Sequence, residues 1–134
     1  MGENRIKLVA ADMDGTLLNR ERKITKYTQN VIKKAMAQGV YFVPATGRAV
    51  NALPPELKEM EGIRYGIFSN GATIYDLKEE KVIYKNHFEM DRVLELMDFL
   101  KQFDLMESIS LNGQSYANKK EMENICLLYT SDAA

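Results

Sequence analysis

The 134-residue sequence predicts an α/β fold built on a parallel β-sheet, and two observations support that prediction. Over the first half of the chain, short apolar runs alternate with segments of helical periodicity, which is the order of strand–helix–strand units. Each apolar run is followed directly by a short turn that carries acidic, hydroxyl or glycine residues. In an open parallel sheet, such turns meet at the carboxyl ends of the strands, where ligands bind.

The first predicted strand is Lys7–Ala11, an apolar run typical of a strand buried on both faces of a parallel sheet. A helix is predicted next, with Thr25 as its N-cap and Gly39 at its C-terminal end. One face of that helix is predicted to be apolar, and it comprises Tyr27, Val31, Ile32, Ala35 and Met36.

Two further strands complete the parallel part, at Val40–Val43 and Tyr65–Phe68. The helix between them is predicted to be weak, because Pro54 and Pro55 are poorly tolerated inside a helix. A β-hairpin is predicted next, from Ala72–Tyr75 and Lys81–Tyr84 with a polar turn between them.

The pattern changes near residue 86, from alternating α/β to a helix followed by antiparallel strands. Asp91 is the predicted N-cap of that helix, whose apolar positions are Val93, Leu94, Met97, Leu100 and Phe103. A second hairpin is predicted from Ser108–Leu111 and Ser115–Ala117, around the Asn112–Gly113 turn. We therefore place a domain boundary here, between residues 1–85 and residues 86–125.

Residues 126–134 read Cys-Leu-Leu-Tyr-Thr-Ser-Asp-Ala-Ala. That string matches, in frame, the translation of a transposon-end sequencing adaptor. We interpret it as a non-native tail and exclude it from the fold. On this interpretation the only cysteine, Cys126, is not native, and the DNA sequencing read ended before the end of the gene.

Charge and hydropathy exclude several function classes. Lys plus Arg total 18 and Asp plus Glu total 19, so the chain has no excess of basic residues. Nucleic acid and anionic membranes, which attract basic proteins, are therefore not expected as partners. No apolar run approaches the ~20 residues that span a bilayer, and the N-terminus does not have the pattern of a signal peptide. The expected location is the cytoplasm.

Two acids follow the first strand directly, in the sequence Asp12-Met13-Asp14-Gly15-Thr16. Carboxylates separated by one residue can take different roles, one as nucleophile and metal ligand and the other as general acid and base. Gly15 allows a tight turn, and successive backbone N–H groups in such a turn, here those of Met13, Gly15 and Thr16, form an anion-binding nest. Asp-Gly is also a common surface turn, but its position after a strand favours a catalytic phosphate site.

The turns after the other two strands complete the candidate site. Thr46, Gly47 and Arg48 follow the second strand, where the hydroxyl can donate to a phosphoryl oxygen and the guanidinium can pair with a phosphate. Asn70 follows the third strand, and it either faces a substrate or only forms the turn with Gly71. His87 has no neighbours at metal-ligand spacing and is interpreted as an ordinary linker residue.

With these motifs in place, the sequence resembles the haloacid dehalogenase-like (HAD) hydrolases, specifically the Cof-type phosphatases. The resemblance rests on Asp12–Leu18, Ala45–Arg48 and Ser69–Tyr75, and it runs from about Lys7 to Tyr75 and more loosely to Ile125. It implies a Rossmann-like parallel-sheet core, incomplete here, followed by the start of an α+β cap domain.

By resemblance, Asp12 attacks the phosphoryl group of a small phosphorylated metabolite, with sugar phosphates as the expected class, and forms an aspartyl-phosphate. Asp14 protonates the leaving alcohol and then activates water. Mg²⁺ binds the Asp12 carboxylate and the Asp14 backbone carbonyl, and Thr46 holds the phosphoryl oxygens. These roles agree with phosphoryl transfer as a reaction of positioning and charge neutralisation.

The family also uses a downstream lysine and a Gly-Asp-x-x-Asn-Asp-like metal motif. No such motif follows Arg48 in this sequence, and none of the lysines after Arg48 is identified as the family's lysine. The truncated chain is therefore expected to have weak activity or none, and its first strand to be an open apolar edge that promotes aggregation. Two alternatives remain at this point: a phospho-acceptor signalling domain and a non-catalytic phosphate-binding module.

Overall fold

The computed structural model describes residues 5–103, 105, 108–111 and 114–117. Within the chain, contacts divide into two compact units, Met1–Asn86 and His87–Ala134. The first unit is an α/β sheet with its helices, and the second contains one helix and one β-hairpin in its described part. The candidate site lies wholly in the first unit.

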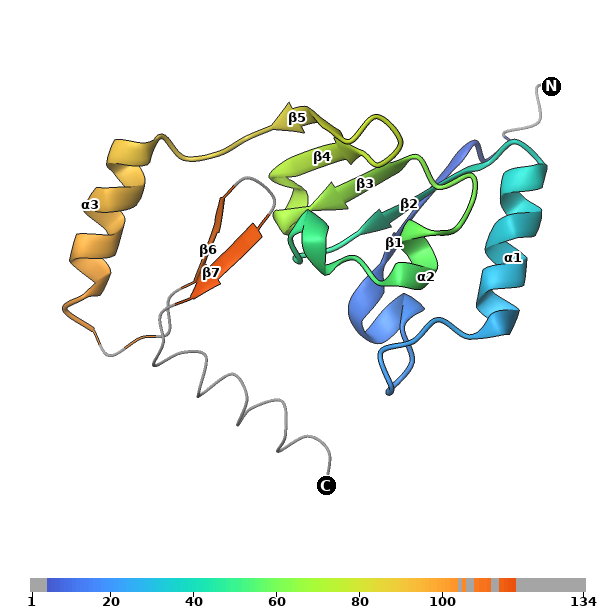
Figure 1. Ribbon diagram of the computed structural model, residues 1–134, viewed down its shortest axis with the longest axis horizontal. Helices are drawn as coiled ribbons and strands as arrows, with labels where there is room; N and C mark the ends of the chain where they lie inside the picture. Colours follow the sequence, from blue (N-terminus) through green and yellow to red (C-terminus); the bar gives the residue numbers. More distant parts are fainter. Residues whose placement is uncertain (1–4, 104, 106–107, 112–113, 118–134) are drawn as a thin grey trace. The chain divides into compact units, whose positions relative to one another are not determined.

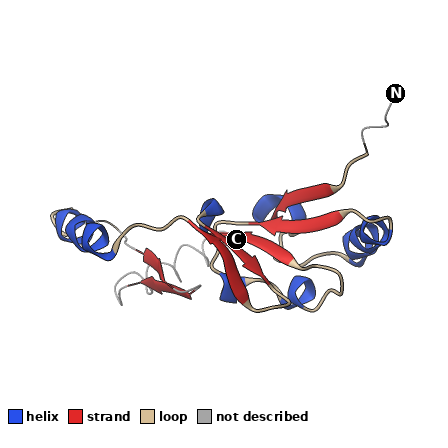
Figure 2. Ribbon diagram, turned by 90° about the horizontal axis from the view of Figure 1, so that it is seen from above, coloured by secondary structure: helices blue, strands red, loops and turns tan. Residues whose placement is uncertain are grey.

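The first unit contains a five-stranded sheet in the order β1-β2-β3-β4-β5 (Figure 1). Its strands are β1 (Leu8–Asp12), β2 (Tyr41–Ala45), β3 (Tyr65–Phe68), β4 (Thr73–Asp76) and β5 (Lys81–Lys85). β1, β2 and β3 are parallel, whereas β4 and β5 join them as an antiparallel hairpin. Successive strands are turned relative to one another, as the right-handed twist of strands requires (Figure 2). The predicted parallel sheet and the first predicted hairpin are both confirmed.

Helix α1 (Lys26–Ala37) connects β1 to β2, and both of its predicted ends are confirmed. The Thr25 hydroxyl accepts a hydrogen bond from the Thr28 N–H at 3.1 Å. At the other end, Gly39 has φ +83°, its N–H donates to the Met36 carbonyl, and the Val40 N–H donates to the Ala35 carbonyl. These two bonds form the Schellman ending that a glycine at this position favours.

The predicted apolar face of α1 is only partly correct. Ile32 is buried, and Ala35 and Met36 are half-buried, but Tyr27 is 79% exposed and Val31 is 48% exposed. The helix therefore buries a narrower stripe than its sequence suggests, and the strand that it contacts most is β2.

The connection from β2 to β3 shows how the chain accommodates two successive prolines. A 3₁₀ turn, η2 (Val50–Ala52), precedes a single-turn helix, α2 (Pro55–Lys58), and Pro55 occupies the first helical position. A proline is acceptable there because its missing N–H would have no partner within the helix. The predicted weak helix is thus one turn long.

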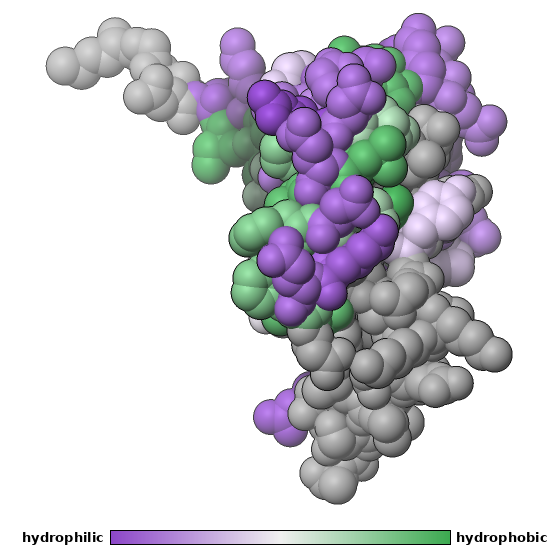
Figure 3. All heavy atoms as spheres, turned by 90° about the vertical axis from the view of Figure 1, so that its left-hand side faces the viewer, coloured by the Kyte–Doolittle hydropathy of each residue, from purple (hydrophilic) through white to green (hydrophobic). Residues whose placement is uncertain are grey.

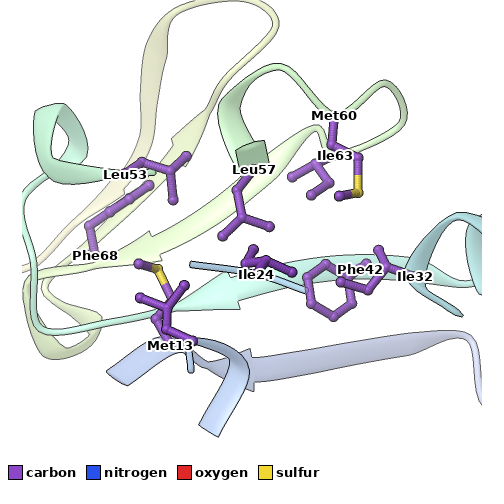
Figure 4. Close-up of a cluster of buried hydrophobic side chains, with 10 residues drawn as sticks. Met13, Ile24, Ile32, Phe42, Leu53, Leu57, Met60, Ile63 and Phe68 are labelled. Atoms are coloured by element: carbon purple, nitrogen blue, oxygen red, sulfur yellow. The ribbon is translucent and has the colours of Figure 1, made fainter. Parts of the chain in front are cut away.

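The hydrophobic core lies against β2 and β3 and is closed by side chains from α1, α2 and the loops (Figure 4). Its fully or nearly buried members are Met13, Leu18, Ile24, Ile32, Phe42, Leu53, Leu57, Met60, Ile63 and Phe68. β1 contributes no buried side chain: Leu8 is 54% exposed and Val9 is 38% exposed. The expectation that this strand is buried on both faces is therefore wrong, because β1 pairs only with β2 and forms an edge of the sheet.

In the second unit, α3 (Met90–Leu100) precedes the antiparallel strands β6 (Ser108–Leu111) and β7 (Gln114–Ala117). The N-cap of α3 is Glu89, and Asp91 lies in the first turn, so the predicted cap is wrong by two positions. The predicted hairpin is confirmed in its strands, while its Asn112–Gly113 turn and the interpreted tail lie outside the described residues.

The apolar positions of α3 are less buried than expected. Val93, Met97 and Leu100 are half-buried, but Leu94 and Phe103 are about half exposed. On the face that Figure 3 shows, hydrophobic residues accordingly lie at the surface beside hydrophilic ones. Among the described residues, no helix has the length and apolarity needed to cross a membrane.

Candidate functional site

The candidate site is built where three parallel strands end together. Asp12 is paired with Ala45 in the register of β1 and β2, and Ala45 is paired with Ile67 in the register of β2 and β3. The turns that follow these strands therefore leave the sheet at the same end (Figure 1). This is the end at which open α/β sheets bind their ligands.

The turn after β1, η1 (Met13–Leu17), is anchored in the core and presents its acids to solvent. The side chain of Met13 is fully buried, whereas Asp12 and Asp14 are exposed. Gly15 has φ +78°, a backbone conformation that costs other residues ~1–2 kcal/mol. The predicted tight turn at Gly15 is thus present, and any contact between Met13 and a phosphate would have to come from its backbone.

Within this turn, the Thr16 hydroxyl donates to Oδ2 of Asp12 at 3.2 Å. That bond orients the Asp12 carboxylate, and it leaves Oδ1 as the second oxygen of an exposed side chain. The arrangement suits a carboxylate that acts as a nucleophile or a metal ligand, because one oxygen is held while the other faces solvent.

Asp14 is held by Arg48, from the turn after β2. The guanidinium Nε donates to Oδ2 of Asp14 at 2.9 Å, and Nη2 donates to Oδ1 at 2.5 Å. Nη1 donates to the Ala52 carbonyl at 3.4 Å. Such a two-bond pair is geometrically specific, and lysine could not reproduce it. The motifs in the sequence predict both residues at the site, but no local pattern predicts that they pair with each other.

Thr46 is buried at the centre of the site, with 5% of its surface exposed. Its Oγ1 accepts a hydrogen bond from the Arg48 N–H at 3.1 Å. Since a hydroxyl that accepts this bond still carries its own hydrogen, Thr46 can donate to an anion placed beside it.

The turns after β2 and β3 are joined by backbone hydrogen bonds. The Ser69 N–H donates to the Arg48 carbonyl at 3.0 Å, and the Asn70 N–H donates to the Thr46 carbonyl at 3.2 Å. The structure therefore brings Asn70 beside the Thr46–Arg48 turn. Ser69, which has φ +50°, was not identified from the sequence because serine carries no signal for that conformation.

The oxygen donors at the first turn fit a magnesium ion. Mg²⁺ prefers oxygen ligands, keeps several waters, and is usually bound by one or two carboxylates together with substrate phosphates. The Asp12 carboxylate and the Asp14 backbone carbonyl could supply such ligands. Within the part of the chain that the structure describes, no group of three or more His, Cys, Asp or Glu side chains could hold a metal ion by itself.

A second arginine–aspartate pair lies at the opposite end of the sheet. Asp76 ends β4 and is paired with Tyr65 at the start of β3. Its carboxylate accepts hydrogen bonds from Arg64 and from the N–H groups of Lys78 and Glu79, all at 3.0 Å. Burial raises the pKa of Asp76, but these hydrogen bonds outweigh burial, so its pKa is lowered from its ordinary value. This pair organises the β4–β5 turn and is remote from the candidate site.

Comparison with known proteins identifies similar sequences and structures. A family model described as haloacid dehalogenase-like hydrolase matches residues 9–132. A Buchnera aphidicola protein named "Putative phosphatase" is 38% identical over 121 residues, which is 88% of this chain and 43% of that protein. The 5-amino-6-(5-phospho-D-ribitylamino)uracil phosphatase of Bacillus subtilis is 37% identical over 89 residues, which is 63% of this chain and 36% of that protein.

Among solved structures, a Bacteroides thetaiotaomicron phosphatase of the haloalkanoate (HAD) enzyme superfamily has a TM-score of 0.76 and is 27% identical. The alignment covers 93% of this chain and 48% of that chain. The present chain thus spans less than half the length of each of these three proteins.

Proposed function

Since this chain belongs to the haloacid dehalogenase-like hydrolase family, we propose that its strand-end site is the phosphoryl-transfer site of a magnesium-dependent phosphatase. The observation that supports this proposal most is the meeting of three turns at one end of the sheet. There an exposed Asp12, an Arg48-held Asp14 and a buried Thr46 hydroxyl lie on adjacent strand ends. Phosphoryl transfer requires a nucleophile, a proton carrier and donors to the phosphoryl oxygens in such an arrangement.

The first half of the proposed reaction forms an aspartyl-phosphate. Oδ1 of Asp12 attacks phosphorus, and the bond between phosphorus and the substrate oxygen breaks as the new bond forms. Asp14 gives its proton to the departing alkoxide, which leaves as an alcohol. The Thr46 hydroxyl donates to a phosphoryl oxygen, where negative charge is concentrated.

The second half returns the site to its starting state. Asp14, now a carboxylate, takes a proton from water, and the water oxygen attacks phosphorus. The bond between Asp12 and phosphorus breaks, and inorganic phosphate is released. Because both oxygens of Asp14 accept hydrogen bonds from Arg48 here, one of them must turn away from the guanidinium when Asp14 carries the proton.

Magnesium, held by the Asp12 carboxylate and the Asp14 backbone carbonyl, would neutralise charge on the phosphoryl oxygens. We further propose that the substrate is a small phosphorylated metabolite, with sugar phosphates as the first class to test. Support for this class comes from the Bacillus subtilis relative, whose name places its phosphate on a ribityl chain. On the same reasoning, residues 1–85 belong to the catalytic core and residues 86–125 to a cap domain, in a protein of the cytoplasm.

The decisive experiment replaces Asp12 by Asn and measures release of inorganic phosphate from a panel of sugar phosphates and from p-nitrophenyl phosphate, with Mg²⁺ and with a chelator. Turnover should require both Mg²⁺ and Asp12. Asp91→Asn is the matched control, because it removes the same charge from an exposed position in α3. The proposal fails if a wild-type preparation that releases phosphate does so at the same rate as Asp12→Asn.

The same experiment separates the two alternatives. A non-catalytic phosphate-binding module would bind inorganic phosphate without turnover, and Asp12→Asn would leave that binding largely intact. A phospho-acceptor domain would instead accumulate a stable phosphorylated aspartate, separate from the paired acids, without releasing phosphate repeatedly. The intact-protein mass after incubation with a phosphate donor distinguishes these outcomes.

A further inference from the structure

The turn after β3 has an unusual backbone. Ser69, Asn70 and Gly71, which form η3, have consecutive φ values of +50°, +54° and +92°. The other described non-glycine residues with positive φ, Arg22 and Glu80, occur singly. Conformations of this kind persist where surrounding contacts impose them, and they gather at functional sites.

The contacts that impose this conformation run to the turn after β2, Thr46–Arg48, which we call the phosphate-binding turn. The N–H groups of Ser69 and Asn70 donate to the carbonyls of Arg48 and Thr46, respectively. Below them, the Thr46 N–H donates to the Ile67 carbonyl at 2.9 Å. Two backbone bonds therefore join the turn after β2 to the turn after β3, and a third joins Thr46 to β3 itself. The left-handed residues Ser69 and Asn70 donate the two bonds between the turns.

The Asn70 side chain adds a fourth contact. A Cβ atom placed on Gly47 would lie 2.8 Å from Oδ1 of Asn70 and 3.4 Å from its Cγ. Gly47 does not have a positive φ, so its backbone conformation does not explain the glycine. Instead, the absence of a side chain at position 47 lets the Asn70 amide lie against the backbone between Thr46 and Arg48.

We propose that Ser69–Gly71 is a positioning element for the phosphate-binding turn, and that Asn70 acts as a positioning residue by packing on Gly47. The inference rests on the proposed function for the nature of the ligand. The physical basis of the inference is the hydrogen bond that the Thr46 hydroxyl accepts from the Arg48 N–H. Because of this bond, the backbone of the Thr46–Arg48 turn sets the direction in which the hydroxyl can donate to a phosphoryl oxygen. Asn70 then acts through Thr46 and Arg48 and does not itself contact the phosphoryl group.

Two measurements on Asn70→Gly test this role. Glycine retains access to the left-handed conformation and removes only the side chain. Hydrogen exchange of the amides at positions 69 and 70, without ligand, should accelerate about tenfold, which corresponds to about 1.4 kcal/mol of local opening. Affinity for inorganic phosphate in the presence of Mg²⁺, measured by calorimetry, should weaken severalfold in parallel.

Gly47→Ala supplies the complementary change. The added Cβ displaces the Asn70 amide, so this variant should show both effects, and the double variant Gly47→Ala/Asn70→Gly should return to the level of Asn70→Gly alone. Gly39→Ala is the structural control, because Gly39 has φ +83° and open space around it at the end of α1. It should lower the unfolding temperature without changing phosphate affinity or local exchange at positions 69 and 70.

The outcomes separate the inference from the proposed function. If Asn70→Gly weakens phosphate binding but leaves exchange at positions 69 and 70 unchanged, Asn70 is a phosphate ligand and the positioning role is wrong. If neither quantity changes, the turn does not depend on Asn70 and the inference is also wrong. If the wild type binds no phosphate, the proposed function fails, while exchange in Asn70→Gly still decides whether this side chain holds the turn.

Discussion

Two arginine–aspartate pairs lie at opposite ends of the same sheet, and they differ in the burial of the acid. Asp14, paired with Arg48, has a side chain that is 53% exposed, whereas Asp76, paired with Arg64, is 2% exposed. Both acids accept two hydrogen bonds or more, so the number of bonds does not distinguish them. We infer from this difference that solvent access separates the two pairs: the pair with the buried acid maintains a turn, while the exposed acid is accessible to a ligand.

The largest expected effect is on catalysis at the exposed pair. In any form of the protein that turns over phosphate esters, Asp14→Asn should lower kcat by roughly 10²–10⁴-fold, the usual contribution of a general acid or base. Its unfolding temperature should change little, because Asp14 is half exposed. Steady-state kinetics and thermal unfolding of the same preparation test this, and a large loss of stability would contradict the comparison.

Asp76→Asn should have the opposite pattern. It leaves a buried amide where a carboxylate accepted bonds from Arg64, Lys78 and Glu79, so the unfolding temperature should fall by several degrees. Affinity of the folded protein for inorganic phosphate should stay unchanged, because the residue lies at the other end of the sheet. A variant that keeps its stability but loses phosphate binding would show that the two ends are coupled.

The pH dependence of stability should come from the buried pair. The pKa of Asp76 is lowered in the folded protein, so its contribution to stability is fully present above the unfolded-state pKa of about 3.9. That contribution is lost as the pH falls through the lower folded-state pKa. Urea unfolding between about pH 5 and pH 2 should therefore show a steeper loss of stability for the wild type than for Asp76→Asn.

The smallest expected effect provides a scale for the other three. Thr25→Ala removes the neutral hydrogen bond that caps α1, and it should cost about 1 kcal/mol of unfolding free energy in urea. Phosphate binding and the pH dependence of stability should both be unaffected. If Thr25→Ala is more destabilising than Asp76→Asn, burial of the acid is not what makes the second pair structural.

The most accurate predictions from the sequence were those that depend on a few neighbouring residues. The ends of α1 at Thr25 and Gly39 were predicted correctly, because each depends on hydrogen bonds between residues a few positions apart. Glycine at position 15 was likewise recognised as a tight turn. Asp91 was misjudged as a cap because the chain enters α3 two residues earlier, at Glu89, which makes no side-chain cap bond.

Burial was predicted less well, because it depends on what lies beside each strand. The run Lys7–Ala11 has the composition of a strand buried on both faces, yet Leu8 and Val9 are exposed. The expectation that this strand forms an open edge of the sheet is confirmed. Exposed edges of this kind can pair with other chains, which agrees with the expectation of an aggregation-prone edge.

The strand-end motifs, the ends of α1 and the residue types needed for phosphoryl transfer could be predicted from the sequence alone, because each of these lies within a few consecutive residues. Only the tertiary structure decided that Asp14 pairs with Arg48, 34 positions away, and that Asn70 packs on Gly47. Those contacts depend on the parallel register of β1, β2 and β3, which brings distant turns to one end of the sheet. Strand order and register, which no single segment encodes, therefore set the geometry of the site.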